Sequence, residues 1–441
     1  MDSVLAFILG VVIIVVGLAL SIGLHEIGHL VPAKLFGVKV TQYMIGFGPT
    51  LWSRRRGETE YGVKAIPLGG YISMIGMFPP ARGERAKADS TGFFRGLVQD
   101  ARDSSTESIT AGDEHRAFYL LPVWKRVIVM FGGPFMNLVL AVLLFGVLLM
   151  GFGVAQASTT VASVSECALP ATSERQTCEP GDPAAPGAAA GIEPGDRILS
   201  VAGEPIDDWS ESTAIIREHA GEPVAFVVER DGDTVELEVT PMLSERYLFD
   251  DNGAVVTDAA GDPLTEQAGF VGIGAVVETV QQPVTEVLPT VGEGIAGVAG
   301  IILNLPQRMV DIAEAAFGPG ERDPNGPMSI VGAGRVAGEV AATDQLEVVQ
   351  KAAGLVGLLG SLNLALFVFN LVPLLPLDGG HIAGALWEGI RRGFAKLFRR
   401  PDPGPVDLAR LMPLTLAVVV ILGGMSALLI YADIVKPVQL F

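Results

Sequence analysis

Two histidines four positions apart, with a glutamate beside the first, are the residues of this chain best suited to metal chemistry. They form the string HEIGH, whose polar members are His25, Glu26 and His29. On a helix, side chains four residues apart lie on one face, so both imidazoles can bind one ion. In an H-E-x-x-H string the imidazoles bind Zn²⁺ and the carboxylate activates a water beside it. His25 and His29 are therefore predicted metal ligands, and Glu26 is the predicted general base.

A catalytic zinc site needs a third protein ligand and one open coordination position. Asp378 is the candidate, because it follows two prolines and precedes two glycines in NLVPLLPLDGGHIAG, where a helix must break and restart. Broken helices at membrane depth are tolerated where they line a polar cavity. His381, three residues further on, is the alternative ligand. Asn370 could donate a hydrogen bond to a carbonyl oxyanion, or only pack between helices.

The HEIGH string directly follows a long apolar run. Val4–Leu24 contains no charged residue and is long enough to cross a bilayer as a helix. Ionisable groups at that depth are costly and usually functional. The chain is 49% hydrophobic and 18% charged, which is typical of a membrane protein. Its acidic start, with no small-residue cleavage site after the run, argues against a cleaved signal peptide.

Charge is distributed unevenly along the chain, whose formal net charge is −19. Residues 155–266 carry 23 acidic and 5 basic side chains, whereas residues 31–126 and 388–410 are basic. Cytoplasmic loops favour Lys and Arg. We therefore expect the acidic region outside the cytoplasm, and the HEIGH string toward the cytoplasmic side of the cell membrane. The chain has no basic domain that could neutralise phosphates, so nucleic acid is disfavoured as a partner.

Two regions outside the spans show further local patterns. Residues 59–77 alternate and are rich in β-branched residues, which predicts a β-hairpin interrupted at Gly69-Gly70 and preceded by a turn at Gly46–Pro49. Cys167 and Cys178 lie in the acidic region, where a disulfide can persist, although two free thiols are the alternative.

The acidic region also carries the pattern of a small β-rich domain. Ala189–Ile206 contains GxxPGDxIxxVxG, and two alternating runs are joined by Asp231-Gly232-Asp233, a hairpin signal. The first pattern resembles the PDZ family over residues 161–241. PDZ domains bind extended peptides by strand addition at a sheet edge. Another small β-rich module is the alternative.

Together these patterns predict a polytopic α-helical membrane protein with four transmembrane helices, a membrane-associated β-hairpin region and one extracytoplasmic PDZ-like α+β domain. The predicted segments, in chain order, are a first transmembrane helix at 1–37, the β region at 38–78, a flexible cytoplasmic insertion at 79–120, a second transmembrane helix at 121–154, the PDZ-like domain at 161–241, a linker at 242–350 with an interfacial amphipathic helix at Val287–Leu305, a third transmembrane helix at 351–390, a basic cytoplasmic loop at 391–410 and a fourth transmembrane helix at 411–435.

The motifs HEIGH, FGGPFMN (residues 131–137) and NLVPLLPLDGG (370–380) resemble the site-2 protease family of intramembrane zinc metalloproteases. GFGP, YGVKAIPLGGYISMIG and GPMSIVGAGRVAGE resemble further segments of that family, so the likeness covers most of the chain. The resemblance implies Zn²⁺ as cofactor, His25, His29 and Asp378 as its ligands, and Glu26 as general base. It also implies a supporting role beside the metal for five residues: Asn370, Pro373, Gly133, Pro134 and Asn137.

The resemblance implies hydrolysis of peptide bonds within transmembrane segments of single-pass membrane proteins. A membrane-anchored anti-sigma factor, cut first by an upstream site-1 protease, is the substrate that the family suggests, with signal-peptide remnants as another class. The alternative is a catalytically inactive PDZ-containing membrane adaptor with a structural metal site. Such an adaptor would not need Glu26 between the ligands. A metal-ion transporter would need ligands in successive spans, and the second and fourth spans offer none.

Overall fold

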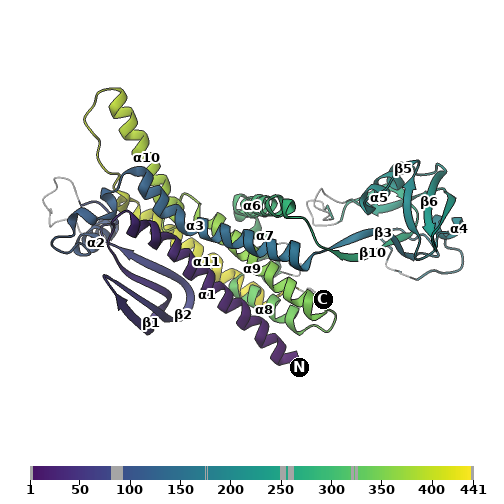
Figure 1. The fold of residues 1–441 in the computed structure, drawn as a ribbon, viewed down its shortest axis with the longest axis horizontal. Helices are drawn as coiled ribbons and strands as arrows, with labels where there is room; N and C mark the ends of the chain where they lie inside the picture. Colours follow the sequence, from purple (N-terminus) through teal and green to yellow (C-terminus); the bar gives the residue numbers. More distant parts are fainter. Residues whose placement is uncertain are drawn as a thin grey trace. The chain divides into compact units, whose positions relative to one another are not determined.

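The computed structural model describes residues 3–80, 93–173, 175, 177–248, 255–256, 263–318, 322 and 326–438. The chain divides into two compact units, Met1–Phe152 with Gln282–Phe441, and Gly153–Gln281. The helices of the first unit are α1 (Ser3–Leu35), α2 (Phe93–Glu107), α3 (Val123–Gly146), α6 (Val287–Leu303), α7 (Leu305–Phe317), α8 (Ile330–Ala342), α9 (Val348–Asn370), α10 (Asp378–Leu397) and α11 (Met412–Val435). Figure 1 shows α1, α3 and α9 side by side.

By length and composition, five helical segments of the described chain can cross a membrane: Ser3–Leu35, Val123–Phe152, Val284–Leu303, Val348–Asn370 and Leu408–Val435. Four of them coincide with the predicted spans. The other contains α6, which was expected to lie at the interface and packs against α9 and α3. Because the segment that contains α6 is also long and apolar enough to cross a membrane, the number of four transmembrane helices stays a prediction.

Helices α1 and α3 cross with their backbones in direct contact. A Cβ added to Gly28 would lie 2.2 Å from the Gly132 carbonyl oxygen, and one added to Gly132 would lie 2.0 Å from that of Gly28. Small residues allow membrane helices to approach this closely, and here only glycine fits. Pro134 lies inside α3, so no N–H is available there for the Met130 carbonyl.

The predicted break in the third span is present between α9 and α10. Asp378 lies in the first turn of α10, directly after tight turns in which the Leu377 N–H donates to the Leu374 carbonyl at 2.9 Å. A Cβ on Gly379 would lie 2.3 Å from the Val372 carbonyl oxygen, so the break itself requires glycine there. The sequence PLDGG therefore folds back tightly and presents Asp378 at a helix start.

The β region forms a longer hairpin than predicted, from β1 (Val40–Arg56) and β2 (Thr59–Met74). The prediction of a turn at Gly46–Pro49 and of a hairpin interrupted at Gly69-Gly70 is wrong, because both segments lie inside strands. Gly46, Gly48 and Gly69 have positive φ angles, which bend the strands. Gln42–Ile45 consequently pairs with residues 60–63 on one side and with residues 70–73 on the other. Residues 70–73 form an edge of this sheet.

Part of the predicted flexible insertion is helical. Residues 81–92 lie outside the described residues, but Phe93–Glu107 forms α2, an amphipathic helix. The Ser105 hydroxyl donates to the Phe78 carbonyl and accepts from its N–H, both at 2.9 Å, and Arg102 pairs with Asp407. These contacts attach α2 to the hairpin end and to the segment before α11.

A buried ion pair joins α11 to the segment that precedes α8. Asp433 pairs with Arg322, and their side chains are only 3% and 4% exposed. The same carboxylate accepts the Ser329 N–H at 2.7 Å, and Ser329 is the residue that caps α8. Charges in an apolar helix bundle are tolerated when they are paired in this way.

The second unit is built mainly of strands. They are β3 (Val154–Val164), β4 (Arg197–Val201), β5 (Glu204–Pro205), β6 (Val224–Arg230), β7 (Asp233–Val239), β8 (Met242–Tyr247), β9 (Thr265–Phe270) and β10 (Ile273–Val280), with helices α4 (Pro186–Ala190) and α5 (Trp209–Glu218). One sheet has the order β10-β3-β4-β6-β7, with β5 on β4, and β8 pairs with β9. The predicted hairpin turn at Asp231-Gly232 is present. The predicted limits of 161–241 are too narrow, since β10 is the partner of β3, and the supposed linker therefore begins with strands.

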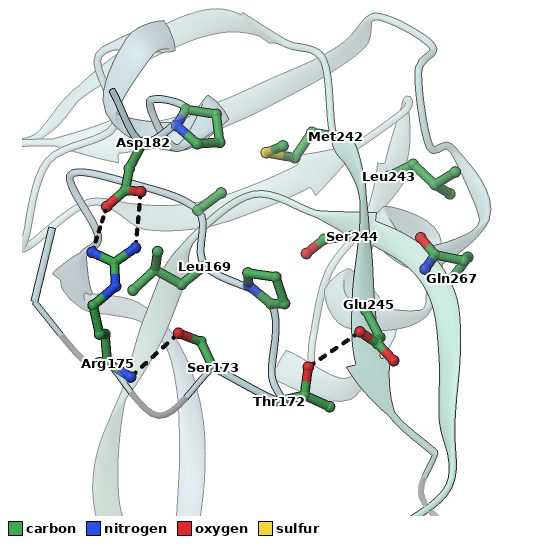
Figure 2. A pocket seen from close by; sticks show the side chains of 13 residues that line it. Leu169, Thr172, Ser173, Arg175, Asp182, Met242, Leu243, Ser244, Glu245 and Gln267 are labelled. Atoms are coloured by element: carbon green, nitrogen blue, oxygen red, sulfur yellow. Dashed lines mark hydrogen bonds and ion pairs between the residues drawn. The ribbon is translucent and has the colours of Figure 1, made fainter. Parts of the chain in front are cut away.

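Cys167 and Cys178 form the predicted disulfide. The loop that they close borders a cavity of about 640 Å³ beside β8 (Figure 2). Arg175 pairs with Asp182 at 3.1 Å, and the Thr172 hydroxyl donates to Glu245 at 3.1 Å. Among the described residues that line this cavity, no group of His, Cys, Asp and Glu side chains is arranged to hold a metal ion.

Candidate metal centre

Three side chains from two helices meet in the first unit. His25 and His29 project from α1, and Asp378 projects from the first turn of α10. Asp378 Oδ2 lies 3.3 Å from His25 Nε2 and 3.2 Å from His29 Nε2, and the two Nε2 atoms lie 3.2 Å apart. The structure thus brings together the three ligands that the sequence suggested. His381 is not part of this cluster.

The spacing of these three atoms fits a zinc ion. In a tetrahedral site with bonds of about 2.0–2.1 Å, ligand atoms lie about 3.3–3.4 Å apart. The observed separations of 3.2–3.3 Å match that value closely. Asp378 Oδ2 is also buried without a hydrogen-bond partner in the described structure, as expected of an atom that binds a metal. Two histidines and one carboxylate leave one coordination position for water or substrate.

Helix α3 packs directly against both imidazoles. A Cβ added to Gly133 would lie 2.2 Å from His29 Nε2 and 2.7 Å from His25 Nε2. The carbonyl oxygen of Val129 lies 2.7 Å from His29 Nδ1 and can only accept, so Nδ1 must carry the proton. His29 Nε2 is then unprotonated and free to bind the metal, an orientation that outer partners of metal-binding histidines commonly impose.

Glu26 lies beside the ligands and contacts the edge of the β region. Glu26 is only 8% exposed, and the backbone N–H of Ile72 in β2 lies near its carboxylate. A Cβ on Gly70 would lie 3.0 Å from Glu26 Cγ, so the strand passes close to the carboxylate. Burial and the nearby Glu26 raise the pKa of Tyr43 to about 12, so this hydroxyl stays protonated and donates to the Gly23 carbonyl at 2.8 Å.

The cluster opens into a cavity of about 360 Å³. Its lining combines polar site residues with apolar membrane-helix residues: Leu18, Ile22, His25, Glu26, Gly69, Gly70, Asn137, Ile330, Leu366 and Asn370. Glu26 and the metal-facing His25 are therefore accessible to a molecule in this cavity, which is what a catalytic rather than a purely structural site requires.

The supporting residues suggested by the sequence occupy different places. Asn370 lines the cavity, and its Nδ2 donates to the Leu366 carbonyl at 2.9 Å. Asn137 lies 3.1 Å from His25, measured between Nδ2 and Nδ1. Pro134 is buried inside α3, whereas Pro373 is exposed in the break before α10 and is not among the residues that line the cavity.

Two partners of the site were not predicted from the sequence. The Val129 carbonyl and the Ile72 N–H are backbone groups, which any residue at those positions would supply. Gly69-Gly70 was the available signal for the second, since paired glycines in a strand often mark a close approach.

Comparison with known proteins identifies the family. The model of peptidase family M50 matches residues 13–399. The chain belongs to peptidase family M50. The zinc metalloprotease Rip1 of Mycobacterium tuberculosis is 33% identical over 99% of both chains, and Rip1 of Mycolicibacterium smegmatis is 34% identical over the same share. The metalloprotease MmpA of Caulobacter vibrioides is 29% identical, covering 88% of both chains.

This M50 peptidase is a zinc-dependent metalloprotease, and its long apolar helices make it a multi-pass membrane protein. The predicted resemblance, the enzyme class and the Zn²⁺ cofactor are thereby confirmed. His25, His29 and Asp378 are the residues of the described structure that would hold the ion.

The contact between Gly133 and the ligands predicts a sharp effect of one methyl group. Gly133→Ala should displace both imidazoles and lower zinc affinity about 10–100-fold, the range seen when the surroundings of a metal ligand are disturbed. Zinc bound per chain after purification in detergent measures the effect. Gly146→Ala is the matched control, because its added Cβ on the same helix meets nothing within 4 Å. Full zinc occupancy in both variants would contradict the packing described here.

Proposed function

We propose that this M50 peptidase cleaves peptide bonds within the transmembrane segments of single-pass membrane proteins. The observation that carries the proposal is the cavity in which Glu26 and His25 stand among apolar side chains of membrane helices, including Leu18, Ile22 and Leu366. Such a lining suits an apolar peptide segment rather than a soluble, charged one. Membrane-anchored anti-sigma factors are the substrate class that we favour, with signal-peptide remnants as another.

The residues of the site can divide the chemistry of hydrolysis among them. When bound, Zn²⁺ would act as a Lewis acid that polarises the carbonyl of the scissile peptide bond and lowers the pKa of the attacking water. The Glu26 carboxylate, which lies near the Ile72 N–H, takes a proton from the attacking water and returns it to the leaving amine. The Asn370 side-chain amide has two N–H groups. One donates to the Leu366 carbonyl, and the other can donate to the carbonyl oxygen of the substrate.

Removing the base without removing the ligands tests this assignment. Glu26→Gln keeps the size of the side chain but cannot accept the proton, so cleavage of a membrane-anchored substrate in detergent should fall at least about 100-fold. Zinc content should stay at the wild-type level, and a chelator should abolish the wild-type activity.

Glu278→Gln is the matched control, because this exposed residue of β10 lies in the other unit. Cleavage retained by Glu26→Gln at the wild-type rate would refute Glu26 as the base.

We further propose that the substrate is held as an extended strand against residues 70–73 of β2. A transmembrane helix hides its carbonyls in i→i−4 hydrogen bonds and must unwind before water can attack. Residues 70–73 pair with β1 on one side only, and Gly69 and Gly70 line the cavity beside Glu26. Adding a strand to such an edge is a common way to bind peptides.

Disulfide crosslinking can detect the extended substrate. Both native cysteines form a disulfide, so Ser73→Cys introduces a single free thiol into the edge strand. In a Glu26→Gln background, single cysteines placed along the substrate should crosslink at alternate positions, because strand side chains alternate. Crosslinks repeating every three to four residues would show a helical substrate and contradict the proposal. Gly96→Cys in α2 is the control for random collision.

We also propose that the second unit is a PDZ-like domain outside the cytoplasm. Its strand content and the hairpin β6–β7 support a PDZ-like fold, and its small number of Lys and Arg residues supports a position outside the cytoplasm. In this role it would tether or size-select substrates, so that only those already trimmed by an upstream site-1 protease reach the site.

Deleting the whole second unit tests whether it excludes untrimmed substrates from the active site. Residues 153–281 can be replaced by a short Gly-Ser linker, because the Gln282 N–H donates to the Leu149 carbonyl at 2.9 Å and the two ends therefore lie close together. The shortened protease should cleave untrimmed substrate as fast as trimmed substrate. A continued requirement for trimming, with activity on trimmed substrate intact, would exclude a filter in this unit.

A further inference from the structure

Asn137 is a fully buried residue whose side-chain amide points its donor nitrogen at His25 and leaves its acceptor oxygen without a partner in the described structure. Its side chain is 0% exposed in α3, with Nδ2 placed 3.1 Å from His25 Nδ1. Its Oδ1 is buried with no hydrogen-bond partner in the described structure. The two ends of a carboxamide have nearly the same shape, so their assignment must come from the donors and acceptors around them.

The ligand geometry fixes which nitrogen of His25 carries the proton. His25 Nε2 lies 3.3 Å from Asp378 Oδ2 and 3.2 Å from His29 Nε2, so Nε2 is the end that binds the metal. An imidazole that coordinates a metal is neutral, and the other nitrogen then bears the proton. The Nδ1–H of His25 is a donor and needs an acceptor. The Asn137 Nδ2 amide is also a donor, so the two groups would oppose each other.

We propose that Asn137 is a positioning residue for the zinc site, whose Oδ1 accepts the Nδ1–H of His25 when zinc is bound. A half-turn of the carboxamide exchanges Oδ1 and Nδ2 and removes the opposed donors. The arrangement then matches His29, whose Nδ1 donates to the Val129 carbonyl at 2.7 Å. Both zinc-binding imidazoles are thus oriented by acceptors on α3, one from the backbone and one from a side chain.

This inference concerns the zinc site itself and does not depend on which substrate is cut. Of the two acceptors, only the Asn137 oxygen can be removed by substitution. Outer partners of metal-binding histidines typically change metal affinity about 10–100-fold when they are replaced. Asn137→Leu should therefore weaken zinc binding by about that factor, whereas Asn137→Asp, which keeps an acceptor oxygen, should stay within about threefold of wild type.

The experiment measures zinc affinity by competition with a chromogenic chelator, using the full chain purified in detergent. Asn363→Leu is the matched control. This residue of α9 is also 0% exposed and has an unpartnered Oδ1, but its Nδ2 donates to Ser21 Oγ at 3.0 Å, away from the ligands. It should lose stability without losing zinc affinity. The melting temperature of each metal-free variant reports whether it is folded, and Asn137→Ala replaces Asn137→Leu if the latter does not fold.

Two results would overturn the proposal. Wild-type zinc affinity in folded Asn137→Leu or Asn137→Ala would show that His25 needs no partner on α3. Equal losses in Asn137→Asp and Asn137→Leu would show that Asn137 acts as a donor or by packing, not as an acceptor. A loss in Asn137→Leu that Asn137→Asp largely restores, with Asn363→Leu unchanged, supports the acceptor role and has no explanation in packing alone.

Discussion

The direct backbone contact between α1 and α3 is the constraint on which the metal centre depends. Gly28 and Gly132 allow the two helices to touch, and the next residue, Gly133, then lies against both imidazoles. At this distance the Val129 carbonyl of α3 accepts a hydrogen bond from His29 Nδ1 at 2.7 Å. The small residues of FGGPFMN therefore serve the chemistry as well as the packing.

Other buried polar side chains of the first unit also make bonds between its helices. Glu388, which is fully buried, pairs with Arg126 of α3 and accepts the Val406 N–H at 2.9 Å. Asn363 links α9 to α1 through Ser21. Unpaired buried groups of this kind would cost several kcal/mol. The Glu388–Arg126 pair joins α10 to α3, and Asp378 lies in the first turn of the same α10.

The sequence predicted those features that depend on residue type at a fixed spacing. The ligand set followed from HEIGH and from the helix break at PLDGG, and four long helices followed from their apolar length. The β region could not be predicted correctly, because Gly46–Pro49 and Gly69-Gly70 look like turns but bend two long strands that pair twice. Helix α2 was missed because most of its residues are polar, and its attachment to the rest of the unit is made by two polar side chains, Ser105 and Arg102. Backbone partners such as the Val129 carbonyl cannot be predicted from residue type, because every residue carries the same carbonyl group.

Asp433 shows that a residue outside the cavity lining can help to position a residue of the cavity wall. Helix α11 contributes no residue to the cavity lining, yet its buried carboxylate holds the Ser329 N–H at the start of α8. The next residue, Ile330, forms part of the cavity wall. The shape offered to a substrate is thus set in part by a helix that never reaches it. Substitutions in α11 can therefore change the shape of the cavity, and with it the substrates that fit, while the metal ligands stay the same.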